Sequence, residues 1–176
     1  MEVNQNKLFP WANVDGLFYN TIVGGITGIG IYKIDEYYLK NMNSIPFFKD
    51  CEPQKTYQNI LESKKNSSML KFKVVCFHPI LEEAVFRGLF RQKQIESNEK
   101  VENILSKINR YVLNSAVFGI SHYDFHRSFR SNIKISPPIF LSGMVFNALM
   151  DTTECIAAPT AAHSVANLLS YKRTIA

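Results

Sequence analysis

The most constraining feature of this chain is that ionisable and amide side chains lie inside its apolar segments. Three segments carry them: residues 80–90 hold Glu82, Glu83 and Arg87, residues 117–122 end with His122, and the last apolar stretch holds His163 and Asn167. Polar groups in apolar helices are costly unless they are paired or used. These side chains are therefore the first candidates for a functional site.

Helical spacing of the apolar residues predicts an all-α fold, because strand patterns are few. In residues 98–118, for example, apolar positions recur with the helical period. The expected helices cover residues 14–31, 69–91 (interrupted or started at Pro79), 98–118, 137–150 and a last one opened by Pro159. The expected connections are a polar segment over 41–66 with at most a short helix near 57–63, a basic loop over 124–136, and a turn over 151–154. We expect a compact bundle of membrane-type helices with the polar side chains facing its interior.

The segment 14–31 is apolar and unusually rich in glycine, with Gly24, Gly25, Gly28 and Gly30 close together. In water, each glycine weakens a helix by up to ~1 kcal/mol. In a membrane, small residues let two helices approach closely. A close helix contact and a buried glycine-rich helix or loop are both consistent with this pattern. A phosphate-binding loop is not, because no Lys-Ser/Thr pair follows the glycines.

Three segments approach the ~20 apolar residues that a membrane-spanning helix needs. They are residues 16–32, 137–150 and 155–171, and each is short or interrupted by polar side chains. The basic stretch from Arg127 to Lys134 would face the cytoplasm by the positive-inside rule. The chain starts without the features of a signal peptide.

Composition excludes several other classes. The net charge is +5, but the basic residues are dispersed and no Lys/Arg block with interleaved aromatics is present, so nucleic-acid binding is not expected. The three cysteines are widely spaced and form no CxxC pair, which argues against a disulfide framework or a cysteine zinc site. The length of 176 residues suits a single domain, residues 1–176.

The spacing of the three charged residues in segment 80–90 separates their roles. Glu83 and Arg87 stand at i and i+4, the favourable order for a helical ion pair. Glu82 is rotated from Glu83 by ~100° around the helix and has no such partner. An unpaired carboxylate in an apolar setting is suited to act as a general base or acid. The alternative is a glutamate that simply faces solvent.

Two further pairs share the i, i+4 spacing. Phe118 would pack beneath the His122 ring, while His163 and Asn167 would project from one helix face into the same space. The second pair could hold an oxyanion or a water molecule. Taken alone, the spacing of either pair is more often that of polar side chains satisfied within a core.

Together the three segments resemble the motifs of the CAAX prenyl protease and bacteriocin-processing (Abi) family. Glu82-Glu83-x-x-x-Arg87 resembles the EExxxR motif, Phe118-x-x-x-His122 the FxxxH motif, and His163-x-x-x-Asn167 the HxxxN motif, in family order. The resemblance extends from about Phe72 to Tyr171. It makes residues 70–171 the expected catalytic core, preceded in 1–69 by an N-terminal helix and a polar connecting segment.

The resemblance implies an all-helical intramembrane endopeptidase and therefore a membrane location. It implies that Glu82 activates the attacking water with help from His122, that His163 and Asn167 stabilise the oxyanion, and that Glu83, Arg87 and Phe118 support the site. Family members are usually longer and more apolar than this chain. The implied partners are membrane lipid and a peptide or protein substrate; prenylated CAAX proteins, leader peptides and membrane proteins are the substrate classes that the family offers.

Two alternatives stay open at this point. Glu82, His122 and His163 form a plausible zinc-ligand set, although the usual helical zinc signature HExxH is missing. We expect a metal-free reaction, with zinc as the alternative cofactor. The second alternative is a non-catalytic membrane or immunity-type binding protein, in which the polar side chains only fasten helices together.

Overall fold

The computed structural model describes residues 16–49, 51, 67–91, 104–125 and 127–175, and these contain helices and turns but no strand. The elements in chain order are α1 (Leu17–Asn43), η3 (Pro46–Phe48), α3 (Ser68–Phe72), η4 (Lys73–Phe77), α4 (His78–Glu83), η5 (Ala84–Phe90), α6 (Ile104–Ser121), α7 (Phe129–Thr153) and α8 (Ala157–Ile175). The all-α prediction is confirmed. The short helix expected near residues 57–63 and the start of the one expected from residue 98 lie outside the described residues.

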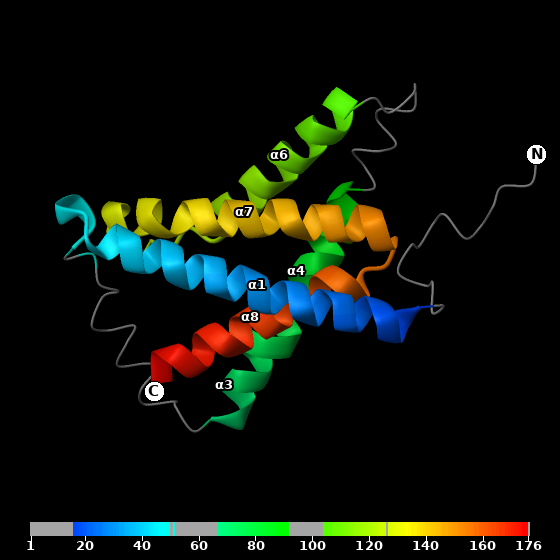
Figure 1. The fold of residues 1–176 in the computed structure, drawn as a ribbon, viewed down its shortest axis with the longest axis horizontal. Helices are drawn as coiled ribbons and strands as arrows, with labels where there is room; N and C mark the ends of the chain where they lie inside the picture. Colours follow the sequence, from blue (N-terminus) through cyan, green and yellow to red (C-terminus); the bar gives the residue numbers. More distant parts are fainter. Residues whose placement is uncertain (1–15, 50, 52–66, 92–103, 126, 176) are drawn as a thin grey trace, which may run out of the picture.

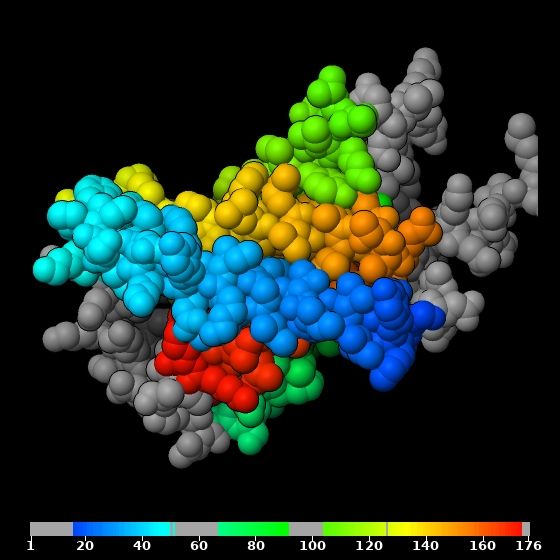
Figure 2. Space-filling model, in the orientation of Figure 1, coloured from blue at the N-terminus to red at the C-terminus, as the bar shows by residue number. Residues whose placement is uncertain are grey.

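Two long helices, α1 and α7, run alongside each other in opposite directions, and α8 packs against both (Figure 1). In the space-filling view, α1 covers the front of the molecule between α7 and α8 (Figure 2). The buried core includes Phe118 of α6, Phe146 and Leu149 of α7 and three alanines of α8. The core therefore lies where α6, α7 and α8 meet, which is also where the candidate residues of α6 and α8 lie.

The segment from Ser68 to Arg91 forms one continuous helix that contains two stretches of wider, π-type winding, η4 and η5. The short α-helical part between them, α4, carries both glutamates. Pro79 explains the first π stretch, because its ring lacks an N–H and crowds the carbonyl four residues earlier. Such π stretches are frequent at functional sites. The prediction of a helix over 69–91 is confirmed, and Pro79 lies inside it without ending it.

The expected basic loop over residues 124–136 is wrong from residue 129 onward, because α7 begins at Phe129. The Ser128 side chain caps this start by accepting a hydrogen bond from the Ser131 amide. Pro137 and Pro138 then lie inside the helix, where a proline usually costs ~3 kcal/mol. Pro138 is buried, as are Ser131, Asn132 and Lys134 in the turns before it.

The glycine-rich segment forms the contact surface between α1 and α8. Gly24 and Gly28 are buried, and a Cβ atom at either position would overlap a backbone carbonyl of α8, that of Ala158 or Ala162 respectively. Both alanines are fully buried. Small residues four apart on each helix thus allow the two backbones to touch, as in close helix pairs within membranes.

Replacing Gly28 with alanine should separate α1 from α8. Overpacking of this kind costs ~1–3 kcal/mol. We expect Gly28→Ala to lower the unfolding temperature of the detergent-solubilised protein, measured by circular dichroism. Gly30→Ala is the matched control, because a Cβ there meets no atom within 4 Å. Equal unfolding temperatures for the two variants would contradict the close contact.

Candidate active site

Glu82 and Glu83 are neighbours on α4, but their carboxylates lie in different surroundings. The Glu83 side chain is fully buried, whereas 29% of the Glu82 side chain is exposed. The predicted helical ion pair is present: Arg87 Nε lies 3.2 Å from Glu83 Oε2, with both side chains excluded from solvent. The spacing argument therefore separated the two carboxylates correctly.

Arg87 is held from several sides at once. Its Nη2 donates to the Gly143 carbonyl of α7 at 3.0 Å, and its guanidinium lies 4.6 Å from the centre of the Phe118 ring and 5.3 Å from that of Phe146. A buried charge is tolerated only with such pairing, and the aromatic faces add cation–π attraction. Arg87 thereby joins the helix that bears the glutamates to α6 and α7.

Glu83 has a second partner that sequence spacing did not reveal. Its Oε1 lies 2.9 Å from Nδ1 of His163, which comes from α8, 80 residues further along the chain. An ionised carboxylate only accepts hydrogen bonds, so His163 donates from Nδ1. The ring also stacks on Phe146, with 5.2 Å between centroids. These contacts fix both the tautomer and the orientation of the imidazole.

Glu82 lies between the two histidines. Its Oε2 is 3.4 Å from Nε2 of His122 and 3.7 Å from Nε2 of His163, and the three ligand-type atoms lie within 4.8 Å of one another. Glu82 Oε2 is screened from solvent and makes no hydrogen bond of normal geometry with a described group. The structure thus brings Glu82, His122 and His163 to one space.

His122 is fixed at its other nitrogen. Nδ1 lies 2.7 Å from the carbonyl oxygen of Phe118, so it is the donor, and the Phe118 ring packs against the imidazole with 4.5 Å between centroids. Phe118 therefore supports His122 as the i, i+4 spacing suggested. It also packs edge-on against the His163 ring at 5.8 Å and so contacts both histidines.

Asn167 is held by a hydrogen bond to the backbone. Its Nδ2 donates to the carbonyl oxygen of Val74 in η4 at 3.1 Å. The same nitrogen carries a second hydrogen, which this bond leaves available. The contact ties α8 to the π stretch before α4, so Asn167 takes part in positioning the glutamate-bearing helix.

The directions of these hydrogen bonds determine which atoms of the two histidines face Glu82. Because Nδ1 is the donor in both histidines, each neutral ring presents the lone pair of Nε2 toward the carboxylate of Glu82. Three electron-pair donors then face one another. Such an arrangement needs a proton, a water molecule or a cation between them. The cluster is consequently suited to binding and activating a small polar species.

Comparison with known families decides the broader assignment. Residues 66–169 match the model of the type II CAAX prenyl endopeptidase Rce1-like family, which is more than half of the chain. The chain belongs to the Rce1-like family. This family comprises proteases that hydrolyse peptide bonds. The resemblance read from the three motifs is confirmed. No curated protein and no solved structure is significantly similar to the chain.

The matched region runs from just before α3 into α8 and so contains all the residues of the three family motifs. It leaves out α1, although α1 supplies the glycine surface on which α8 rests. The position of His163 therefore also depends on a helix outside the family match.

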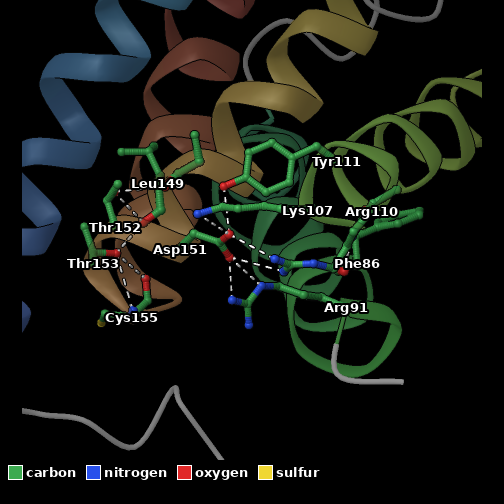
Figure 3. A network of polar contacts seen from close by, with 12 residues as sticks. Phe86, Arg91, Lys107, Arg110, Tyr111, Leu149, Asp151, Thr152, Thr153 and Cys155 are labelled. Atoms are coloured by element: carbon green, nitrogen blue, oxygen red, sulfur yellow. Dashed lines mark hydrogen bonds and ion pairs between the residues drawn. The ribbon is translucent and has the colours of Figure 1, made fainter. Parts of the chain in front are cut away.

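A second polar network, which sequence reasoning missed, ties the site helices together at Asp151 of α7 (Figure 3). The carboxylate accepts from Arg91 Nε at 2.9 Å and from the Tyr111 hydroxyl at 2.8 Å, and it pairs with Arg110 at 3.1 Å and Lys107 at 3.3 Å. Arg91 follows η5, and the other three belong to α6. Asp151 thus fastens the helix that bears Glu82 to α6, which ends one residue before His122.

The sequence carried a signal for this network. Asp151 is a lone acid at the end of the apolar stretch 137–150, and Lys107, Arg110 and Tyr111 share one face of a helix. No local spacing pattern connects Asp151 with these residues of α6, because about 40 residues separate them along the chain. The other missed groups, Gly143 and Phe146, are ordinary members of an apolar helix and carry no local signal of their contacts.

We expect Asp151→Asn to destabilise the fold strongly, because it leaves several cations around a neutral amide. Breaking a buried ion pair from one side costs ~3–5 kcal/mol. Glu36→Gln is the control, since Glu36 forms an exposed pair with Lys33 at 3.1 Å, and such surface pairs contribute ~0–1 kcal/mol. Thermal unfolding in detergent measures both. A loss for Asp151→Asn no larger than that for Glu36→Gln would contradict the anchoring role.

Proposed function

We propose that this protein is an intramembrane endopeptidase in which Glu82 activates the attacking water. The observation that carries the proposal is the approach of the Glu82 carboxylate to Nε2 of both His122 and His163. Membership of the Rce1-like family gives the reaction class, hydrolysis of a peptide bond. The residue roles below are part of the proposal.

In this mechanism, Glu82 takes a proton from a water molecule that His122 holds in place. The water oxygen attacks the carbonyl carbon of the scissile bond, and the carbonyl oxygen becomes an oxyanion. In its charged form, His163 carries a proton on Nε2 as well as on Nδ1, and the Nε2 proton together with the Asn167 amide stabilises that negative charge. When the C–N bond breaks, Glu82 returns its proton to the leaving amine, which restores the starting carboxylate.

Glu83 and Arg87 act in this scheme through His163. The hydrogen bond from His163 Nδ1 to Glu83 keeps the ring turned so that Nε2 faces Glu82. Arg87 balances the charge of Glu83, and without it the buried carboxylate would lack its cation. Both are positioning residues, since Glu83 contacts the outer nitrogen of His163 and Arg87 contacts Glu83.

A membrane location is the second part of the proposal. The family is membrane-embedded, and within the described residues α7 is the one helix long and apolar enough to cross a bilayer. Large apolar side chains also face outward on other helices, among them Phe18 and Ile26 on α1, Leu89 on η5, and Ile104 and Ile120 on α6. Contact with lipid acyl chains would remove this surface from water. The substrate is accordingly a membrane-associated peptide or protein, and a prenylated CAAX terminus is the first to test.

Glu82→Gln should abolish cleavage while leaving the fold intact, because the amide keeps the shape of the side chain but cannot accept the proton. General acid–base catalysis alone contributes ~10²–10⁴-fold, so a loss of at least this size is expected. The measurement is cleavage of a prenylated CAAX peptide by the purified, reconstituted protein.

Glu154→Gln is the matched control, since Glu154 is an exposed glutamate on the turn between α7 and α8. It should retain full activity. If Glu82→Gln also remained active, the non-catalytic binding protein would replace the peptidase as the better explanation of this cluster.

The same cluster supports a second candidate, a zinc-dependent hydrolysis. Glu82 Oε2 and Nε2 of His122 and His163 are the atom types that zinc binds, and the buried, unpartnered Glu82 oxygen fits a cation. Zinc would supply Lewis-acid polarisation and a more acidic bound water. His163 and His122 would then bind through Nε2, with Glu83 and the Phe118 carbonyl holding their outer nitrogens.

Metal analysis separates the two candidates. For the metal-free reaction, we expect the purified protein to lack stoichiometric zinc by elemental mass spectrometry and to keep its activity after chelation. The zinc reaction predicts the reverse: one zinc per chain, lost in His122→Ala, and activity that falls on chelation and returns with zinc.

A further inference from the structure

A cleft of about 770 Å³ lies away from the Glu82 cluster, where the C-terminal ends of α1 and α8 meet the start of α7. These three ends lie on the same side of the molecule in Figure 1. Its size is typical of small-molecule sites. The charged side chains that line it are Glu36, Lys40, Lys49, Arg127, Lys134 and Arg173.

The lining charges are strongly unbalanced. Five of the lining side chains are basic and one is acidic, and that one, Glu36, already pairs with Lys33 at 3.1 Å outside the lining set. Arg127 pairs with Asp124 at 3.3 Å, and Asp35 offsets part of the charge of Arg173. Allowing for these neighbouring acids, the lysines from three separate segments still give the cleft a positive field, which a concave shape concentrates.

Lys134 is the most informative of these side chains. It is 8% exposed, and its Nζ donates to the side-chain oxygen of Asn43 and, at 3.4 Å, to the carbonyl of Phe48. Both partners are neutral oxygens, and no carboxylate pairs with Lys134 among the described residues. A buried ammonium is costly unless it is paired with a charge. An anion in the cleft would supply that charge.

We propose that this cleft binds a phosphate group, either in the headgroup of an anionic lipid or free in solution. Several Lys and Arg side chains converge on it, as in basic pockets that hold lipid headgroups at the membrane surface. Four of the six charged lining residues lie outside the region matched to the family, residues 66–169. The family match thus covers the part of the cleft formed by Arg127 and the start of α7, whereas α1, the segment after it and the end of α8 supply the other charged residues.

Cys51 provides a local reporter, because it lines the cleft and is only partly buried. In a Cys76→Ser background, Cys51 is the accessible thiol of the described residues, since Cys155 is buried.

The experiment measures the rate at which N-ethylmaleimide, a neutral reagent, modifies Cys51 in the full chain held in nanodiscs. One series adds inorganic phosphate to phosphatidylcholine nanodiscs, with chloride at equal ionic strength as the control. The other series replaces part of the phosphatidylcholine with phosphatidic acid.

The proposal predicts that Cys51 is protected by phosphatidic acid, by inorganic phosphate, or by both. Protection by both identifies the phosphate group itself as the ligand, whereas protection by phosphatidic acid alone identifies the lipid headgroup. Lys40→Gln/Lys49→Gln removes two exposed cleft charges and should raise the ligand concentration needed for protection ~30-fold, from about 1 kcal/mol per charge. Lys71→Gln/Lys73→Gln, an equal charge change on the exposed surface of α3 and η4, should leave it unchanged.

Three results would overturn the proposal. The first is modification of Cys51 at the same rate with and without phosphate or phosphatidic acid. The second is equal protection by chloride or by pure phosphatidylcholine. The third is an equal effect of the two double variants, which would indicate general charge attraction without a site in the cleft. None of these readouts depends on peptidase activity.

Discussion

The buried contact of Glu83 with Arg87 and His163 is the interaction on which the site depends. It joins a residue from the glutamate-bearing helix to one from α8, and through Arg87 it reaches the Gly143 carbonyl of α7 and the ring of Phe118 on α6. All the groups are removed from water, so loss of one partner would leave another charge unpaired in the interior. The ionic contact thus also determines where the neighbouring Glu82 and the His163 ring can lie.

Helix packing supports this contact from outside. The two glycines of α1 let its backbone reach the alanines of α8, and the Asp151 network holds α6 and the end of η5 against α7. The contact between α1 and α8 depends on small side chains, and the Asp151 network depends on charge. Both limit how far the packed helices can slide along one another. The cluster of Glu82 with two histidines is consequently built from three segments that are far apart in sequence: α4, the turn that follows α6, and α8.

Sequence reasoning succeeded where the relevant partners are close along the chain. The Glu83–Arg87 ion pair and the packing of Phe118 on His122 both follow from i, i+4 spacing, which depends only on helix geometry. The contact between Glu83 and His163 could not be derived in this way, because 80 residues separate them and only the fold sets their distance. The family resemblance gave Glu83 a supporting role but did not pair it with His163.

At the start of α7, tertiary contacts outweigh the local rule that adjacent prolines begin a helix. Two adjacent prolines normally mark a helix start, but Ser128 offers an earlier cap and the first turns bury Asn132 and Lys134 against neighbouring segments. Tertiary contacts therefore extended the helix beyond the local signal. The same contacts built one wall of the basic cleft, so the misread segment is also the one with a second candidate role.

The adjacency of Glu82 and Glu83 also limits how this gene can change. The two carboxylates have different surroundings only because one residue of helix turns the side chain by ~100°. Deleting a single residue between Glu83 and Arg87 would place Glu82 four residues before the arginine, and so present the wrong glutamate to it. Substitutions on the outer face of this helix should therefore be common among descendants of the chain, whereas changes of length within it should be eliminated by selection.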